Sequence, residues 1–149
     1  MQSLTDILNA NGKRPQVIAD VLTLIDQEVK NKKGVAGFAI KQAYKVVSKL
    51  GGGIIRQAVD KMLDRFVSAL DPFYQSYLAG DQVAALSNFL SGQDNAVANA
   101  LLGVTDQVRN GVDNKVLTKA YDSLRGSALK HVIDAVPAVG QLIQKHTAA

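Results

Sequence analysis

Apolar residues recur three and four positions apart along almost the whole chain, and no segment keeps a two-residue alternation. Ile55, Val59, Met62 and Phe66 show the pattern clearly, because this spacing places all four on one face of a helix. Helices with such faces are stable only when the faces pack against one another. The sequence therefore predicts an all-α fold, a compact bundle of about six to eight helices.

Caps, glycines and prolines divide this pattern into separate helices. Asp81 and Asp94 are candidate N-caps, because a short acidic side chain accepts hydrogen bonds from the first free N–H groups of a helix. Pro72 and Pro137 lack the N–H that a helix interior needs, so we expect each to end the helix before it. Besides two short helices at about residues 3–11 and 73–79, the expected helices span about residues 15–33, 37–50, 54–70, 81–92, 94–109, 113–136 and 138–145.

The chain also resembles itself. Residues 17–27 align with 97–107, and residues 29–31 align with 108–110 once Glu28 is skipped, with six of the fourteen pairs identical. An Ala-Tyr pair at 43 and an Ala-Val pair at 58 recur 77 positions later. We therefore predict an internal duplication of a three-helix unit. The pseudo-repeats cover about 15–70 and 95–145, joined by a short aromatic helical segment at 71–92.

The whole chain, 1–149, is expected to form a single helical domain, because its length suits one hydrophobic core and no linker interrupts it. No run of about eighteen uncharged apolar residues occurs, so no transmembrane segment is expected. The N-terminus is polar and lacks a leading basic cluster, so we expect no secretory signal. The chain has no cysteine, which excludes disulfides and thiolate chemistry, and we expect a cytoplasmic location.

Positive charge is concentrated in the first half of the chain. The net charge is +4 overall, +5 over residues 1–70 and −1 over the remainder. Lys41, Lys45 and Lys49 follow at four-residue steps and form one stripe on a helix. Such a stripe can bind phosphate-bearing partners, but it is also typical of the solvated back of a helix, which is the interpretation we favour. The candidate anion-binding ridge adds Lys30, Lys32, Lys33 and Arg56 to these three.

Two further features bear on anion binding. Nucleic-acid-binding surfaces usually add aromatic or arginine side chains that contact bases, whereas Phe38 and Tyr44 fall on the expected core face. Three glycines at 51–53 before Arg56 outline an anion cradle. The phosphate-loop pattern is missing there, so a plain turn is favoured.

Nothing in the sequence assembles a catalytic or metal site. His131 and His146 are the only histidines, and neither has a second His, Cys or acid pair spaced to share a metal. We expect His131 on a half-buried helix and His146 in a frayed C-terminal tail. The sequence thus predicts no catalytic residue, no metal and no cofactor, and we do not expect an enzyme.

Aromatic side chains gather in the middle of the chain. Residues 71–77 hold three of the eight, namely Phe73, Tyr74 and Tyr77. An exposed cluster of this kind marks a partner surface. The alternative, which we favour, is a plug that packs between two pseudo-symmetric halves.

Four segments together resemble a family of small actinobacterial all-helical proteins, a domain of unknown function. These segments are Lys13-Arg14-Pro15 with Val17–Asp20, Lys41 with Ala43-Tyr44, Asp71-Pro72-Phe73, and Ala120-Tyr121 with Ser123–Gly126. The resemblance implies a bacterial cytoplasmic protein, and it assigns no activity, cofactor or site.

These observations favour a non-catalytic binding or scaffold protein that engages a protein partner, or a second copy of itself, through helical surfaces. The strongest alternative is a lipid-binding protein whose basic amphipathic helices bind a membrane surface or enclose a lipid between the repeats. Nucleic-acid binding through the Lys41/Lys45/Lys49 ridge is the third hypothesis.

Overall fold

The structure is a computed structural model that describes residues 3–50 and 53–147. Within these residues it contains seven α-helices, one 3₁₀ helix and no β-strand, which confirms the all-α prediction. No helix in these ranges is both long enough and apolar enough to cross a lipid bilayer. The elements are α1 (Leu4–Asn9), η1 (Ala10–Gly12), α2 (Arg14–Asn31), α3 (Gly34–Ser48), α4 (Ile54–Ala79), α5 (Leu86–Ser91), α6 (Asp94–Asn110) and α7 (Lys115–Thr147).

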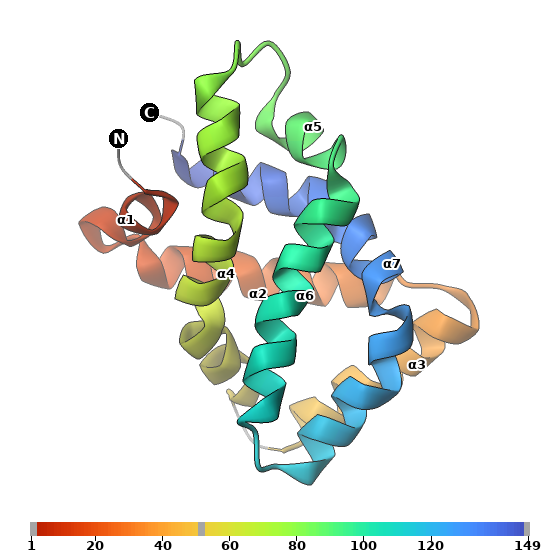
Figure 1. The fold of residues 1–149 in the computed structure, drawn as a ribbon. Helices are drawn as coiled ribbons and strands as arrows, with labels where there is room; N and C mark the ends of the chain where they lie inside the picture. The colour runs from red at the N-terminus through yellow and green to blue at the C-terminus, as the bar shows by residue number, and fades with distance from the viewer. Residues whose placement is uncertain (1–2, 51–52, 148–149) are drawn as a thin grey trace.

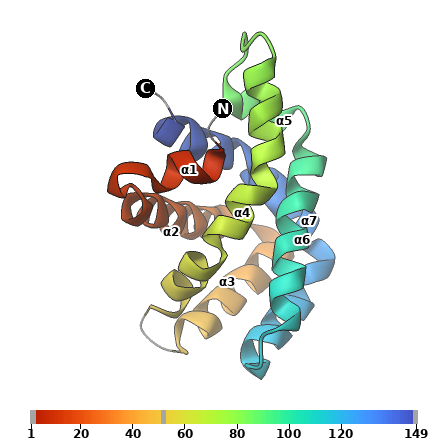
Figure 2. The ribbon, with the colours of Figure 1, turned by 60° about the vertical axis from the view of Figure 1, so that its left-hand side comes forward.

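The long helices form two crossed layers. Helices α4 and α6 pack side by side in one layer, and α2 and the second half of α7 cross behind them in the view of Figure 1. Helix α5 packs on α7 beside the end of α4. Helix α3 lies at the edge of the bundle, where it contacts α2, α7 and the start of α4 (Figures 1 and 2).

The buried core occupies one half of the molecule. Burial of a side chain such as leucine or valine stabilises the fold by about 1.5–3 kcal/mol. The other half is thinly packed, because α7 has no buried residue before Val136 and α3 has only Gly37. The largest fully buried side chains are Leu4, Leu86, Leu90, Val17, Val97 and Val136.

Helix α4 continues through Pro72, so the helix end expected there is wrong. Leu70 and Tyr74, on either side of the proline, are both buried and carry the apolar row of the helix into the core. Their burial offsets a proline cost of about 3 kcal/mol in a helix interior. Asp71, next to the proline, accepts at Oδ1 a 2.7 Å hydrogen bond from the N–H of Leu4, at the start of α1. Its side chain thus caps a helix that is distant in the sequence.

Helix α7 likewise runs through Pro137, and the separate closing helix expected after it is wrong. The carbonyl of Pro137 accepts a 2.9 Å hydrogen bond from the hydroxyl of Ser87 in α5. The second proposed repeat therefore comprises two helices, α6 and α7, whereas the first comprises α2, α3 and α4. The duplication itself stays a prediction.

Two helix starts also differ from expectation. Helix α5 begins at Leu86, because Asp81 accepts a 3.1 Å hydrogen bond from the N–H of Val83 in a short turn and does not cap a helix. Val83 is exposed as a result. Helix α3 begins at Gly34, three residues early, since a φ of +75° at this glycine reverses the chain directly after α2.

His146 is buried in the last turn of α7, so the frayed tail expected there is wrong. Its Nε2 lies 2.6 Å from Oδ2 of Asp20 in α2, and the same oxygen accepts a 2.9 Å hydrogen bond from Nζ of Lys145. The hydrogen bond from Lys145 lowers the pKa of Asp20, against the effect of burial and with a smaller contribution from His146. These contacts fasten the end of α7 to α2.

A close approach between α7 and α5 can be tested at Gly140. In Gly140→Ala the new Cβ would lie 2.6 Å from Cα of Ser87, so the two helices must separate. We expect the free energy of unfolding to fall by about 1–3 kcal/mol, measured by thermal or denaturant unfolding. Gly126→Ala is the matched control in the same helix, because its Cβ meets nothing within 4 Å. Gly126→Ala should be neutral or stabilising by up to about 1 kcal/mol. Equal losses of unfolding free energy in the two variants would contradict a close contact between Gly140 and Ser87.

The Asp20 contacts predict a pH-dependent stability. Because the folded protein lowers the pKa of Asp20, its contribution is complete above the ordinary value of about 3.9 and is lost as the pH falls through the lower folded value. Asp20→Asn should therefore lower Tm by roughly 3 °C at pH 7. The difference in Tm between Asp20→Asn and wild type should disappear as the pH falls below about 3.9. Asp113→Asn, at an exposed carboxylate before α7, is the control, and a pH-independent deficit in Asp20→Asn would refute the ion-pair explanation.

Candidate functional site

Helix α3 presents most of its surface to solvent. Its inward face consists of Gly37, which is buried, and of Ile40, Ala43, Tyr44 and Val47, which are half-buried. A glycine at position 37 is needed for this packing, because a Cβ there would lie 2.6 Å from the carbonyl carbon of Lys32. The helix is thus held by one narrow face against α2, α4 and α7.

Large apolar side chains lie on the outward face of α3 and just beyond its end. Val35 is 90% exposed, Phe38 64%, Val46 47% and Leu50 38%. The prediction that Phe38 faces the core is therefore wrong, whereas Tyr44 is half-buried. The cause is that apolar residues surround α3 on almost every side, while the bundle covers only one of them. Val35, Phe38, Val46 and Leu50 are called the apolar row below.

A row of lysines runs beside the apolar row. Lys41, Lys45 and Lys49 are all exposed and follow Phe38 at three, seven and eleven positions, which places them on one side of the same face. Among the residues that the structure describes, none of the three forms an ion pair. The surrounding stretch 29–59 contains seven Lys or Arg residues and no Asp or Glu. The face is therefore strongly cationic.

The rest of the predicted ridge divides into exposed and engaged residues. Lys33 and Arg56 are exposed. Lys30 forms a 2.9 Å ion pair with Asp26, which raises the pKa of the lysine. Lys32 has a side chain only 11% exposed, lying between carboxylates of α2 and α7, and it joins these helices. The partners of Lys32 are Glu28 and Asp134 at 3.7 Å each and the carbonyl of His131 at 3.3 Å.

The glycine cradle cannot be placed, because Gly51 and Gly52 lie outside the described residues. Gly53 precedes α4 with a φ of +81°, a conformation that favours glycine.

The aromatic segment is used for packing at the end of α4. Tyr74 is buried in the core, and Phe73 and Tyr77 are half-buried against it. The Tyr77 ring meets Phe89 of α5 edge-on at 5.3 Å, and its hydroxyl donates a 2.9 Å hydrogen bond to the carbonyl of Ala84. The aromatic segment thus joins α4 to α5 and to the loop before α5. Tyr74 belongs to the buried core and does not form an exposed surface.

His131 lies half-buried on α7, and both ring nitrogens are enclosed without a hydrogen-bond partner among the described residues. Burial lowers the pKa of His131, and the neighbouring Lys32 lowers it further, while Asp134 opposes them. The described part of the chain brings together no group of three or more side chains able to hold a metal ion.

Sequence reasoning missed a polar cluster between α6 and the first half of α7. Arg125 binds Asp106 through Nε at 2.8 Å and Nη2 at 3.0 Å, and the Tyr121 hydroxyl also donates to this carboxylate. The hydrogen bonds from Arg125, and to a lesser extent from Tyr121, lower the pKa of Asp106. Burial and the hydrogen bond to Asp106 raise the pKa of Tyr121. Arg109 and Asp122 form a second two-point pair nearby. Only the four-residue spacing of Tyr121 and Arg125 on α7 signalled that these side chains share a face.

Comparison with known proteins identifies a family for the chain. The model of a family of unknown function, DUF6918, matches residues 4–147, so the chain belongs to this family. No curated protein and no solved structure matches it.

Proposed function

We propose that this member of a family of unknown function is a non-catalytic binding protein that docks the outward face of α3 on an anionic membrane surface. The observation that carries the proposal is the lysine row beside the exposed apolar row on one helix. Helices that lie in a membrane interface combine these two features, because apolar side chains enter the headgroup region while lysines meet anionic lipids.

Magnitudes support two cooperating contributions. A lysine close to an anionic leaflet is worth about 1 kcal/mol, so Lys41, Lys45 and Lys49 supply roughly 3 kcal/mol. Phe38 and Val35 add apolar burial of about 25 cal/mol per Å² removed from water. Neither contribution alone gives firm attachment, which is why the adjacency of the two rows matters.

Charge also orders the competing partners. A symmetric dimer through this face would bring two lysine rows to one interface with no acidic residue of residues 29–59 to neutralise them, which disfavours the homo-oligomer that the sequence allows. Nucleic acid would use the lysines but leave Val35 and Val46 exposed. An acidic protein partner fits the charge, and it is an outcome of the test below. The anionic surface in this proposal is the cytoplasmic leaflet of a bacterial membrane.

Vesicle flotation tests the lysine row. The protein should float with vesicles that contain phosphatidylglycerol, stay behind with phosphatidylcholine alone, and lose binding as salt rises. Lys41→Gln with Lys45→Gln should weaken binding about 30-fold, from ~1 kcal/mol per lysine. Lys61→Gln with Arg65→Gln removes two exposed charges from α4 and should have little effect. Equal losses in the two double variants, or no flotation at all, would overturn the proposal.

The apolar row is tested separately by Phe38→Ser with Val46→Ser. Both side chains are exposed, so the variant should keep the wild-type Tm while losing flotation. Val83→Ser, at a still more exposed apolar residue in the loop before α5, is the control and should float normally. Retained flotation in the double variant would contradict insertion. A stable dimer or acidic protein complex that the double variant abolishes would assign the face to that partner instead.

A further inference from the structure

An apolar cavity that is partly open to solvent lies between α2, α4, α6 and α7, with α1 at one end. Its volume is about 270 Å³, and all fifteen residues that line it are apolar. Protein interiors are normally packed so tightly that voids larger than a water molecule are few. Eight of the lining residues are only half-buried although they lie between helices, among them Met62, Phe66 and Leu101. The helices therefore leave between them a space that their own side chains do not fill and that is partly open to solvent.

We propose that this cavity binds a single medium-length hydrocarbon chain whose uncharged polar head lies in the adjoining groove between α2 and α7. An apolar cavity without polar partners excludes water and accepts apolar molecules. The ligand class is therefore a primary alcohol or another neutral single-chain amphiphile. The inference does not rest on membrane docking, because it uses no residue of α3.

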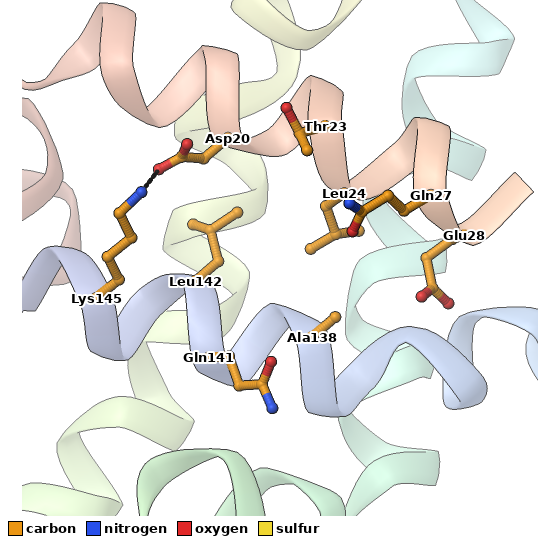
Figure 3. Close-up of a pocket in the computed structure, with 9 residues that line it drawn as sticks. All are labelled: Asp20, Thr23, Leu24, Gln27, Glu28, Ala138, Gln141, Leu142 and Lys145. Atoms are coloured by element: carbon orange, nitrogen blue, oxygen red, sulfur yellow. Dashed lines mark hydrogen bonds and ion pairs between the residues drawn. The ribbon is translucent and has the colours of Figure 1, made fainter. Parts of the chain in front are cut away.

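The groove between α2 and α7 gives the cavity an entrance (Figure 3). Leu24 and Leu142 line both the groove and the cavity, so these two side chains form the boundary between them. In Figure 3 both leucines project from their helices into the space between α2 and α7. The groove itself has a volume of about 250 Å³. Its polar lining consists of Asp20, Thr23, Gln27, Glu28, Gln141 and Lys145.

The charges in the groove select the head of the ligand. Its lining contains two carboxylates, Asp20 and Glu28, and one ammonium group, Lys145. Lys145 already forms a 2.9 Å ion pair with Asp20, seen as the dashed line in Figure 3. Glu28 lies 3.7 Å from the ammonium group of Lys32, so the charged side chains of the groove are already paired and an anionic head would find no free cation there. A hydroxyl head needs no such partner, because it can exchange hydrogen bonds with the neutral side chains of Thr23 and Gln141.

The cavity volume sets the length of the hydrocarbon chain. A dry cavity of about 150 Å³ accommodates benzene, with its six carbon atoms. In proportion, 270 Å³ holds roughly ten carbon atoms. Longer chains must leave their additional methylenes in the groove, where these groups gain less from burial.

Titration of the whole protein with 1-alkanols from hexanol to tetradecanol, without vesicles, tests the proposal. We expect the affinity to rise about fourfold for each added methylene, as expected from ~0.8 kcal/mol per buried group, and to level off near ten carbons. Decanoate should bind more weakly than decanol. A rise that continues without a plateau indicates adsorption to the surface and would overturn the cavity assignment, as would absence of binding by every alcohol.

Leu101→Trp fills the cavity from α6 and should abolish decanol binding while the helical circular dichroism is kept. Leu124→Trp introduces the same side chain at a half-buried site of α7 outside the cavity, and it should bind decanol like wild type. Equal binding by both variants would refute the site. If Leu101→Trp does not fold, the plateau in the wild-type series still decides. The Phe38→Ser, Val46→Ser variant should bind decanol normally, so failure of this proposal and failure of membrane docking are distinguishable.

Discussion

The packing of the second half of α7 against α5 and α2 is the constraint on which the rest of the structure depends. Gly140 allows the backbone of α7 to approach Ser87, and the hydroxyl of that serine donates a hydrogen bond to the carbonyl of Pro137. At the last turn, Asp20 holds Lys145 and His146. With this half fixed, the first half of α7 extends from the core as a continuous helix and carries α3 at its side. The thinly packed half of the molecule, including the exposed face of α3, is a consequence of that arrangement.

The lining of the apolar cavity bears on stability. All fifteen lining residues are apolar, and eight of them keep part of their surface exposed between the helices. Removal of apolar surface from water contributes about 25 cal/mol per Å², so a hydrocarbon chain in the cavity gains from burial of its own surface and of this lining. A ligand that binds the folded state in this way stabilises it in proportion to its occupancy.

The sequence was sufficient for the helical class, because the apolar periodicity is a local property that tertiary contacts only reinforce. It failed at Pro72 and Pro137, where burial of Leu70, Tyr74 and Val136 outweighs a local helix-breaking preference. The lysine row of the candidate site was visible as a four-residue repeat. Periodicity places its apolar neighbour Phe38 in the core, because it identifies apolar residues but not which of them the bundle covers. Partners such as Asp71 with Leu4 are 67 residues apart and leave no local signal.

The two proposed binding regions meet at the last turn of α2. Glu28 lines the groove at the entrance to the cavity, and its carboxylate lies 3.7 Å from the ammonium group of Lys32. Lys32 also binds Asp134 of α7, and its backbone lies directly beneath Gly37 of α3. The helix α3 is therefore in close contact with the residue that directly follows α2. Because Lys32 is nearly buried and holds carboxylates from two helices, the base of α3 and the α2–α7 groove are joined through side chains already in contact.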